Sequence, residues 1–272
     1  MPWTSEHLKW LKDTGEQLQT TDGKAVRIWE FVHADEEAVL SAWAKHFRNH
    51  YCLDTKIDLL KPDHFTRAEY LKEIKFPDQS VAPGPSIRAG DFGEILVADY
   101  VQYVLGYSVP RTRYCDKSIR NESSKGCDVI GFKLLGNGVE SEHDMLAVFE
   151  AKAQFSGRKP KPRLQDAIEG STKDELRKAE SLNAIKQRLL SGQHPDDAAV
   201  VARFQDPEDH PYGEVYGAVA LFSTAVFVSE HISNSTTAEA HPHKDNLHLI
   251  VIRGPNMMQL VHELYRRATD EA

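Results

Sequence analysis

The chain has 272 residues, of which 40% are hydrophobic and 27% charged, an ordinary composition for a globular protein. Its formal net charge of −8 argues against a surface that is basic throughout, but leaves room for a local basic groove. The three cysteines lack C-x-x-C spacing, which excludes a zinc ribbon and a disulfide framework. No secretory signal and no long apolar run is visible, so we expect a cytoplasmic protein without a membrane span.

Residues 1–84 predict a small α/β segment, which we consider a candidate for binding a partner. Residues 25–33, AVRIWEFVH, form a strand-like run, and an apolar stripe predicts a helix near residues 35–50. The loop 76–90 is rich in proline and glycine, and such loops separate structural units. We therefore place a boundary here and expect a second unit over residues 85–272.

The second unit alternates predicted helices with predicted strands, which is typical of a mixed α/β fold. Helices are expected near 90–105, where Gly106 stops the helix, near 163–190 and from about 255 onward. Strands are expected at 108–114, 127–135, 145–153, 198–204, 215–228 and 246–252. The helix near 163–190 is expected to bury Leu164, Ile168, Leu176, Ala179, Leu182, Ile185 and Leu189. The pair Asn137-Gly138 predicts a hairpin turn between the second and third strands.

The run AVFEAK, residues 147–152, places a carboxylate and an amine at the end of an apolar strand. An acid-x-Lys pattern occurs four times in the chain, but only this copy ends such a strand. Side chains alternate across a strand, so Glu150 and Lys152 share one face with Leu146 and Val148. A buried carboxylate is costly without a partner, so we expect a cation or a donor beside Glu150.

The preceding strand brings a second carboxylate to the same place. A hairpin centred near residue 139 sets Asp128 opposite Glu150, whereas a centre at 137–138 sets it opposite Ala147. The length of the polar loop favours the first register. Two carboxylates about 5 Å apart repel by roughly 3 kcal/mol at an effective dielectric near 20. Oxygen ligation of Mg²⁺ or Mn²⁺ would turn this repulsion into a binding site.

A glycine-rich helix start supplies a third candidate carboxylate. In GDFGEILVAD, residues 90–99, Glu94 lies at the margin of an apolar stripe, and the glycines permit a close backbone approach. Asp91 lies on the same side of the helix, three residues earlier, but we favour a structural role for it. Glu94 is therefore the helix residue expected to join Asp128 and Glu150.

This order of a helix glutamate, a strand aspartate and a Glu-x-Lys strand resembles the PD-(D/E)XK nuclease superfamily. The resemblance covers about a third of the chain and implies a restriction-endonuclease-like core, in which helices flank a central mixed sheet. It implies that Glu94, Asp128 and Glu150 hold Mg²⁺ or Mn²⁺, with the carbonyl of Ala151 as a further ligand. Lys152 would orient or activate the attacking water, while metal and lysine neutralise the developing charge.

Longer runs around these residues resemble one family more closely. GDFGEILVADYV, KGCDVIGF and AVFEAKAQFSG are similar to the HamA family, the nuclease subunit of the Hachiman anti-phage system. The resemblance implies a DNA-degrading effector held in complex with a partner helicase, and a chain without an ATPase motif of its own is consistent with such a partner. A sister defence nuclease would carry the same short motifs.

Basic residues follow the Glu-x-Lys strand directly. Arg158, Lys159, Lys161 and Arg163 crowd together in a protein that is acidic overall. We consider them candidate contacts to a nucleic-acid backbone, although a solvated loop is the commoner fate of such a cluster. A second basic island lies upstream, between residues 111 and 125.

Two classes of function remain open from the sequence. The first is a metal-dependent DNase, which the set of Asp128, Glu150 and Lys152 favours. The second is a non-catalytic adaptor on a nuclease-like fold, which binds a helicase or nucleic acid without cutting. In that case Glu150 and Lys152 are only an ion pair on an edge strand. Metal dependence separates the two, whereas the sequence does not decide between DNA and RNA or between single and double strands.

Overall fold

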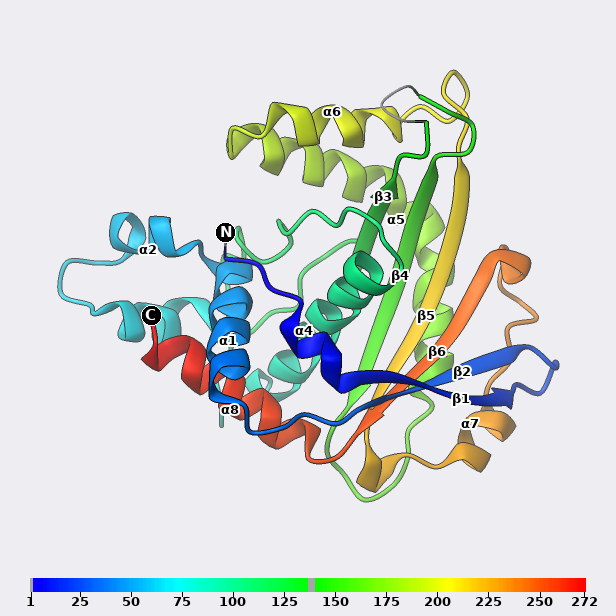
Figure 1. Cartoon of the computed structure of the whole chain (residues 1–272), viewed down its shortest axis with the longest axis horizontal. Coiled ribbons are helices and arrows are strands. Elements are labelled where there is room, and N and C mark those ends of the chain that lie inside the picture. The colour runs from blue at the N-terminus through cyan, green and yellow to red at the C-terminus, as the bar shows by residue number, and fades with distance from the viewer. Residues whose placement is uncertain (1, 137–139) are drawn as a thin grey trace.

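The computed structural model describes residues 2–136 and 140–272, with a six-stranded mixed sheet between two layers of helices (Figure 1). The strand order is β1-β2-β6-β5-β4-β3, in which β2, β6, β5 and β4 run parallel and the two edge strands are antiparallel to their neighbours. The strands are β1 (Leu11–Gln19), β2 (Ala25–Phe31), β3 (Val129–Lys133), β4 (Met145–Gln154), β5 (Gly213–Ser223) and β6 (Leu247–Gly254). The predicted turn at Asn137-Gly138 lies outside the described residues.

Helices cover both faces of the sheet. The core on one face involves α1, α3, α4 and α8, and the core on the other involves α5, α6 and α7. The helices are α1 (Glu37–Tyr51), α2 (Asp54–Leu60), α3 (Arg67–Tyr70), α4 (Gly84–Asp99), α5 (Arg163–Ser191), α6 (Pro195–Arg203), α7 (Ser229–Ser235) and α8 (Met257–Asp270). Short 3₁₀ or π-helical turns lie at Glu6–Trp10, Leu71–Lys75, Tyr100–Val104, Thr224–Val226 and Lys244–Asn246. None of the helices in the described ranges is long and apolar enough to cross a membrane.

The alternation of side chains along β4 decides which layer each residue meets. Ala147, Phe149 and Ala151 belong to the core on the α4 side of the sheet. Leu146 and Val148 belong to the core on the α5 side. Because alternate residues of a strand share a face, the next residues in the second series, 150 and 152, also lie toward α5.

Most predicted elements are confirmed, and the mixed α/β fold with them. The strands expected at 25–33, 127–135, 145–153, 215–228 and 246–252 correspond to β2, β3, β4, β5 and β6. The helices expected near 35–50, 90–105, 163–190 and from 255 correspond to α1, α4, α5 and α8. Gly106 has a φ of +76°, a left-handed conformation suited to the end of a helix, as its glycine predicts.

The prediction of a strand at 198–204 is wrong, because these residues belong to α6 and its C-terminal end. Pro195 lies in the first turn and two aspartates follow it, which is a helix-start signal. Ala198 and Val201 are three residues apart and are both buried in the core on the α5 side. A spacing of three residues places both side chains on one side of a helix, so the β-branched composition was a misleading signal.

Two further expectations are wrong. Residues 108–114 are not a strand, and within the described ranges they pair with the sheet only through an isolated bridge between Ser108 and Phe132. On α5, Leu176 and Ala179 are exposed rather than buried. Leu176 lies six residues before the buried Leu182, and six residues at 3.6 per turn bring a side chain to a different side of the helix.

The N-terminal segment contributes to the same sheet as the rest of the chain. β1 and β2 form an antiparallel pair, and β2 continues the sheet through parallel pairing with β6. The proposed boundary at residue 84 coincides with the start of α4 at Gly84, so the second half of the expected loop 76–90 is helical. The division into units 1–84 and 85–272 stays a prediction about sequence modules, while the sheet joins both.

Candidate active site

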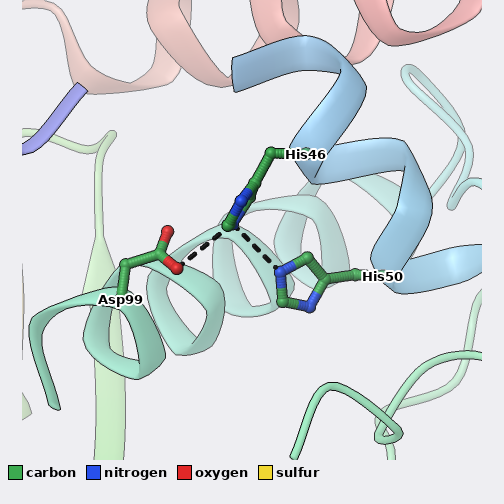
Figure 2. A group of neighbouring side chains, drawn as sticks. All are labelled: His46, His50 and Asp99. Atoms are coloured by element: carbon green, nitrogen blue, oxygen red, sulfur yellow. Dashed lines mark hydrogen bonds and ion pairs between the residues drawn. The ribbon is translucent and has the colours of Figure 1, made fainter. Parts of the chain in front are cut away.

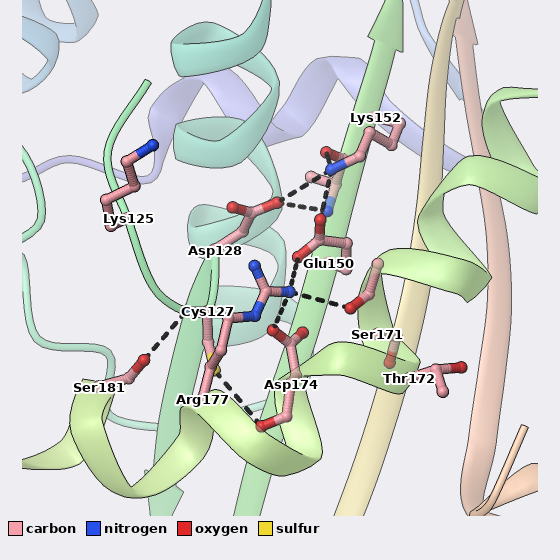
Figure 3. A network of polar contacts seen from close by, with 12 residues as sticks. Lys125, Cys127, Asp128, Glu150, Lys152, Ser171, Thr172, Asp174, Arg177 and Ser181 are labelled. Atoms are coloured by element: carbon pink, nitrogen blue, oxygen red, sulfur yellow. Dashed lines mark hydrogen bonds and ion pairs between the residues drawn. The ribbon is translucent and has the colours of Figure 1, made fainter. Parts of the chain in front are cut away.

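The strand register brings Asp128 and Glu150 together, as the first of the two hairpin alternatives predicts. Val129 pairs with Phe149 and Ile130 with Val148, so continuation of the ladder sets Asp128 opposite Glu150. The backbone N–H of Ala151 donates to Oδ2 of Asp128 at 3.1 Å, which holds this carboxylate at the end of the ladder (Figure 3).

Lys152 joins these two carboxylates. Its Nζ donates to Oε1 of Glu150 and lies 3.8 Å from Oδ2 of Asp128. The Glu150 side chain is 5% exposed and that of Lys152 is 33% exposed, so the pair closes a buried site at its solvent side. Figure 3 shows the three side chains pointing toward one another at the strand ends.

The carbonyl of Ala151 faces the same place. The N–H and C=O of one strand residue point to the same side, and the N–H of Ala151 points toward Asp128. β3 begins only at Val129, so no ladder residue of β3 stands opposite this carbonyl. Lys152 Nζ lies 3.4 Å from the carbonyl oxygen. Ala151 therefore offers a further oxygen beside the carboxylates.

Glu94 reaches this group through an arginine. Its Oε2 accepts hydrogen bonds from Nε of Arg113 at 2.7 Å and from the hydroxyl of Tyr114 at 2.6 Å. Nη2 of Arg113 donates to Oδ1 of Asp128 at 2.7 Å. Arg113 thus bridges the helix carboxylate and the strand carboxylate, a contact that the sequence did not suggest.

Several other basic residues upstream of β3 are committed to carboxylates inside the protein. Lys117 lies 2.7 Å from Asp91, which also accepts a hydrogen bond from the Tyr51 hydroxyl, so Asp91 has structural partners as expected. Arg120 pairs with Asp78 at 3.2 Å. These cations are therefore engaged in holding the chain together.

Helix α5 supplies a fourth carboxylate, Asp174, that sequence reasoning missed. Its side chain is fully buried, and Oδ1 accepts from Nη2 of Arg177 at 2.7 Å. The same Nη2 lies 3.8 Å from Oε2 of Glu150. The small residue Gly170, one turn before Asp174, was the available signal, because a glycine inside a long helix marks a close approach. We call Glu94, Asp128, Glu150 and Asp174 the carboxylate cluster.

Crowding changes the acidity of three members of the carboxylate cluster. Burial, against the opposing effect of Arg113, raises the pKa of Glu94 to about 7. Burial and the neighbouring Asp128 raise the pKa of Glu150 to about 8. Burial raises the pKa of Asp174 to about 6, in spite of Arg177. Because the ionised forms are disfavoured, additional positive charge at this place would be stabilising.

The donor set fits the divalent cation that the resemblance implies. All candidate ligand atoms are oxygens from carboxylates or a backbone carbonyl, which are the ligands that Mg²⁺ and Mn²⁺ prefer. Oε2 of Glu150 is buried and has no hydrogen-bond partner within the described residues. An orphaned oxygen on a carboxylate that also faces Lys152 and Asp128 is what a cation site requires.

The downstream basic residues lie in the loop between β4 and α5. Gln154, the last residue of β4, holds the next loop through hydrogen bonds to the carbonyl of Lys159 at 2.9 Å and the N–H of Lys161 at 2.8 Å. Arg158, Lys159 and Lys161 are exposed, and Arg163 pairs with Asp166 at 2.8 Å. We call residues 158–161 the basic loop.

A second polar group, formed between α1 and α4, also resembles a metal site, but its hydrogen bonds argue against metal binding. His46, His50 and Asp99 converge in Figure 2, with Nε2 of His46 3.1 Å from Asp99 and 3.2 Å from Nε2 of His50. Nδ1 of His46 accepts from the N–H of Thr4, so the proton of a neutral ring is on Nε2, which then has no lone pair for a metal.

Arg111 gives this second group a positive charge of its own. Its Nη1 lies 2.7 Å from Oδ1 of Asp99 and 3.4 Å from Nε2 of His50. His7 completes the group, with Nε2 2.9 Å from Oδ2 of Asp99. The cation repels a metal and already neutralises the carboxylate. We call His7, His46, His50, Asp99 and Arg111 the N-terminal clasp, because it holds the start of the chain to α1 and α4.

The mixed sheet flanked by helices, with carboxylates and a lysine at the end of β4, defines an α/β protein with a nuclease-like core. A sequence model of the HamA family matches residues 6–268, nearly the whole chain. The chain belongs to the HamA family, and the resemblance noted from its motifs is confirmed at that level. Membership indicates a component of the Hachiman anti-phage defence system. No curated protein matches the chain.

Proposed function

We propose that the protein is a Mg²⁺- or Mn²⁺-dependent nuclease that hydrolyses phosphodiester bonds of DNA, as the effector of a defence complex with a helicase partner. The observation that carries the proposal is the convergence of Asp128, Glu150 and Lys152 at one end of a buried ladder. Their order along the chain is that of the PD-(D/E)XK superfamily. Membership of the HamA family supports DNA as the substrate and a helicase as the partner.

In this proposal Asp128, Glu150, Glu94 and the carbonyl of Ala151 hold the cation. Once bound, the cation would act as a Lewis acid toward the phosphate and favour deprotonation of a water. The Lys152 ammonium lies at the exposed side of the carboxylates, where it orients water and neutralises charge on the phosphate oxygens. Arg113 keeps Glu94 and Asp128 in place through its two short ion pairs.

The basic loop is the proposed contact to the DNA backbone. It follows β4 directly, so its cations stand a few residues from Lys152 along the chain. Its exposed side chains suit contacts to phosphates, which position the duplex without reading sequence. Within the ranges that the structure describes, Arg158, Lys159 and Lys161 form no ion pair that would have to break first.

The decisive experiment measures cleavage of plasmid and linear DNA, with Mg²⁺ or with EDTA, by the chain alone and together with any helicase encoded beside it. We expect cleavage that EDTA abolishes and that Glu150→Gln or Lys152→Ala lowers by about a thousandfold or more. Glu169→Gln, an exposed acid on α5, is the matched control and should cut like the wild type. Circular dichroism verifies that each variant is folded.

Other outcomes would count against the proposal. Cleavage by Glu150→Gln at the wild-type rate would show that the nucleolytic site lies elsewhere. A folded wild-type chain that neither cuts DNA nor binds Mn²⁺, alone or with the helicase, would favour the non-catalytic adaptor.

A further inference from the structure

We infer that Asp174 of α5 is a ligand of the same divalent cation, so that the cation site extends from the strand ends onto the helix. This inference rests on the proposed function and adds to it a ligand that lies outside the Glu-x-Lys motif. It starts from Glu150, which turns one oxygen toward Lys152 and the other toward α5 (Figure 3).

Two buried anionic oxygens on the α5 side have no hydrogen-bond partner. Oε2 of Glu150 and Oδ2 of Asp174 are both without one within the described residues. The side chains of these residues are 5% and 0% exposed. Buried carboxylate oxygens are normally satisfied, and two that are not, on side chains that both contact Arg177, leave acceptors open to a cation.

The guanidinium group of Arg177 shows that a positive charge fits beside Asp174 and Glu150. Its Nη2 lies 2.7 Å from Oδ1 of Asp174, 2.9 Å from the carbonyl of Gly170 and 3.8 Å from Oε2 of Glu150. One nitrogen thus lies near both carboxylates, although the contact to Glu150 is too long for a hydrogen bond. The two carboxylates therefore share one positive group, and a metal ion bound between them would compete with Arg177.

The close approach of α5 to Glu150 depends on Gly170. A Cβ at this position would lie 2.5 Å from Oε1 and 2.7 Å from the carboxyl carbon of Glu150. Any side chain would push the helix or the carboxylate away. The glycine therefore allows Asp174, one turn further along α5, to stand beside Glu150.

A purely structural role for Asp174 makes a different prediction. If Asp174 serves only to hold Arg177, loss of either residue breaks the same ion pair and should have the same effect. If Asp174 is a ligand, its loss removes an oxygen from the cation, whereas the loss of Arg177 removes a competing positive charge. The two variants then change cation affinity in opposite directions.

The test is calorimetric titration of metal-stripped, full-length protein with Mn²⁺, for the wild type, Asp174→Asn, Arg177→Gln, Glu150→Gln and Glu169→Gln. We expect Asp174→Asn to weaken Mn²⁺ binding at least tenfold and Glu150→Gln to weaken it as much or more. Arg177→Gln should bind Mn²⁺ more tightly than the wild type, and the control Glu169→Gln should bind it as the wild type does. The Mn²⁺-induced rise in the melting temperature gives a second readout.

The outcomes separate this inference from the proposed function. Wild-type affinity in Asp174→Asn, together with loss in Glu150→Gln, overturns the role of Asp174 and leaves the nuclease site intact. Equal weakening by Asp174→Asn and Arg177→Gln also overturns it, in favour of the structural role. No Mn²⁺ binding by the wild type overturns both proposals. If Asp174→Asn does not fold, Arg177→Gln decides alone, since tighter binding supports the inference and unchanged or weakened binding contradicts it.

Discussion

Helix α4 contributes one carboxylate to each of two buried charged groups, and the groups differ in their balance of acids and cations. In the N-terminal clasp a single carboxylate, Asp99, is surrounded by Arg111, His7 and His46, so donors outnumber acceptors. Although burial opposes it, these neighbours hold the pKa of Asp99 well below its usual range. In the carboxylate cluster four acids share Arg113, Lys152 and Arg177, and acceptors outnumber donors.

The difference separates a structural group from a binding group. A buried carboxylate that faces a cation and several donors is neutralised by the protein itself. Buried carboxylates that outnumber the cations beside them are costly in the protein alone, and a cation from solution offsets that cost. Proximity of ligand-type side chains is therefore a weaker sign of a metal site than a surplus of buried acids over cations.

The largest expected effect is on the free energy of unfolding, and it compares the loss of a carboxylate from each of the two groups. Asp99→Asn should lower the free energy of unfolding by about 3–5 kcal/mol, because it leaves Arg111 buried without its partner. Glu150→Gln should cost little or even stabilise the metal-free protein, because it removes one of several crowded acids. Urea denaturation in EDTA measures both changes. Equal losses in the two variants would mean that the clusters do not differ in the way proposed.

A smaller effect is expected from crowding the carboxylate cluster. Gly170→Ala should destabilise the protein by about 1–3 kcal/mol through overpacking and weaken Mn²⁺ binding, because the added Cβ displaces Glu150. The matched control is Gly90→Ala on α4, where a Cβ would meet no atom within 4 Å. That control should be neutral or slightly stabilising, since alanine is the better helix former. Thermal denaturation and Mn²⁺ titration report the two effects.

Substitutions in the basic loop should weaken DNA binding without changing the carboxylate cluster or the N-terminal clasp. Arg158→Ala/Lys159→Ala should lower the slope of log K against log salt by about 2, because two phosphate contacts are lost. The surface pair Lys56→Ala/Lys72→Ala serves as the matched control and should leave the slope unchanged. Fluorescence anisotropy with a labelled duplex at several salt concentrations measures the slope. An unaltered slope in the loop variant would remove this loop from the interface.

The smallest expected effect is the change in stability of the folded protein with pH. Burial lowers the pKa of His7, and burial with the neighbouring Arg111 lowers that of His50 well below 6.5. Below pH 6.5 the unfolded chain therefore binds more protons than the folded one, so stability is complete above pH 6.5 and falls as the pH decreases. His50→Gln should remove part of this dependence. The difference between the pH–stability curves of wild type and variant isolates it, and parallel curves would contradict the assignment.

The sequence was sufficient for the strand part of the site and for most of the fold. Periodicity along β4 placed Glu150 and Lys152 on one face, and the hairpin register placed Asp128 opposite Glu150, because both follow from local rules of strands. Asp174 and Arg177 were missed, because their role depends on how closely α5 packs on β4. The distance between α5 and β4 is a tertiary property, and Gly170 is the one residue in the sequence that indicates it.

Other misses have the same origin. In the sequence Arg113 belongs to a basic island, but in the structure it lies partly buried between Glu94 and Asp128. This placement depends on the path of a long loop. The β-branched residues around Val201 favour a strand, whereas the proline and the two acids before them start a helix. Local composition predicts elements well where spacing and capping agree, and poorly where they compete.

The pairing of β2 with β6 limits how the chain can be divided. A protein that began at residue 85 would leave β6 as an open parallel edge, with a row of unpaired backbone groups able to recruit other chains. It would also leave Asp99 without His7 and His46. Residues 85–272 would then be prone to aggregation rather than an independent module, so gene fusions or fragment exchanges within this family should keep the first two strands.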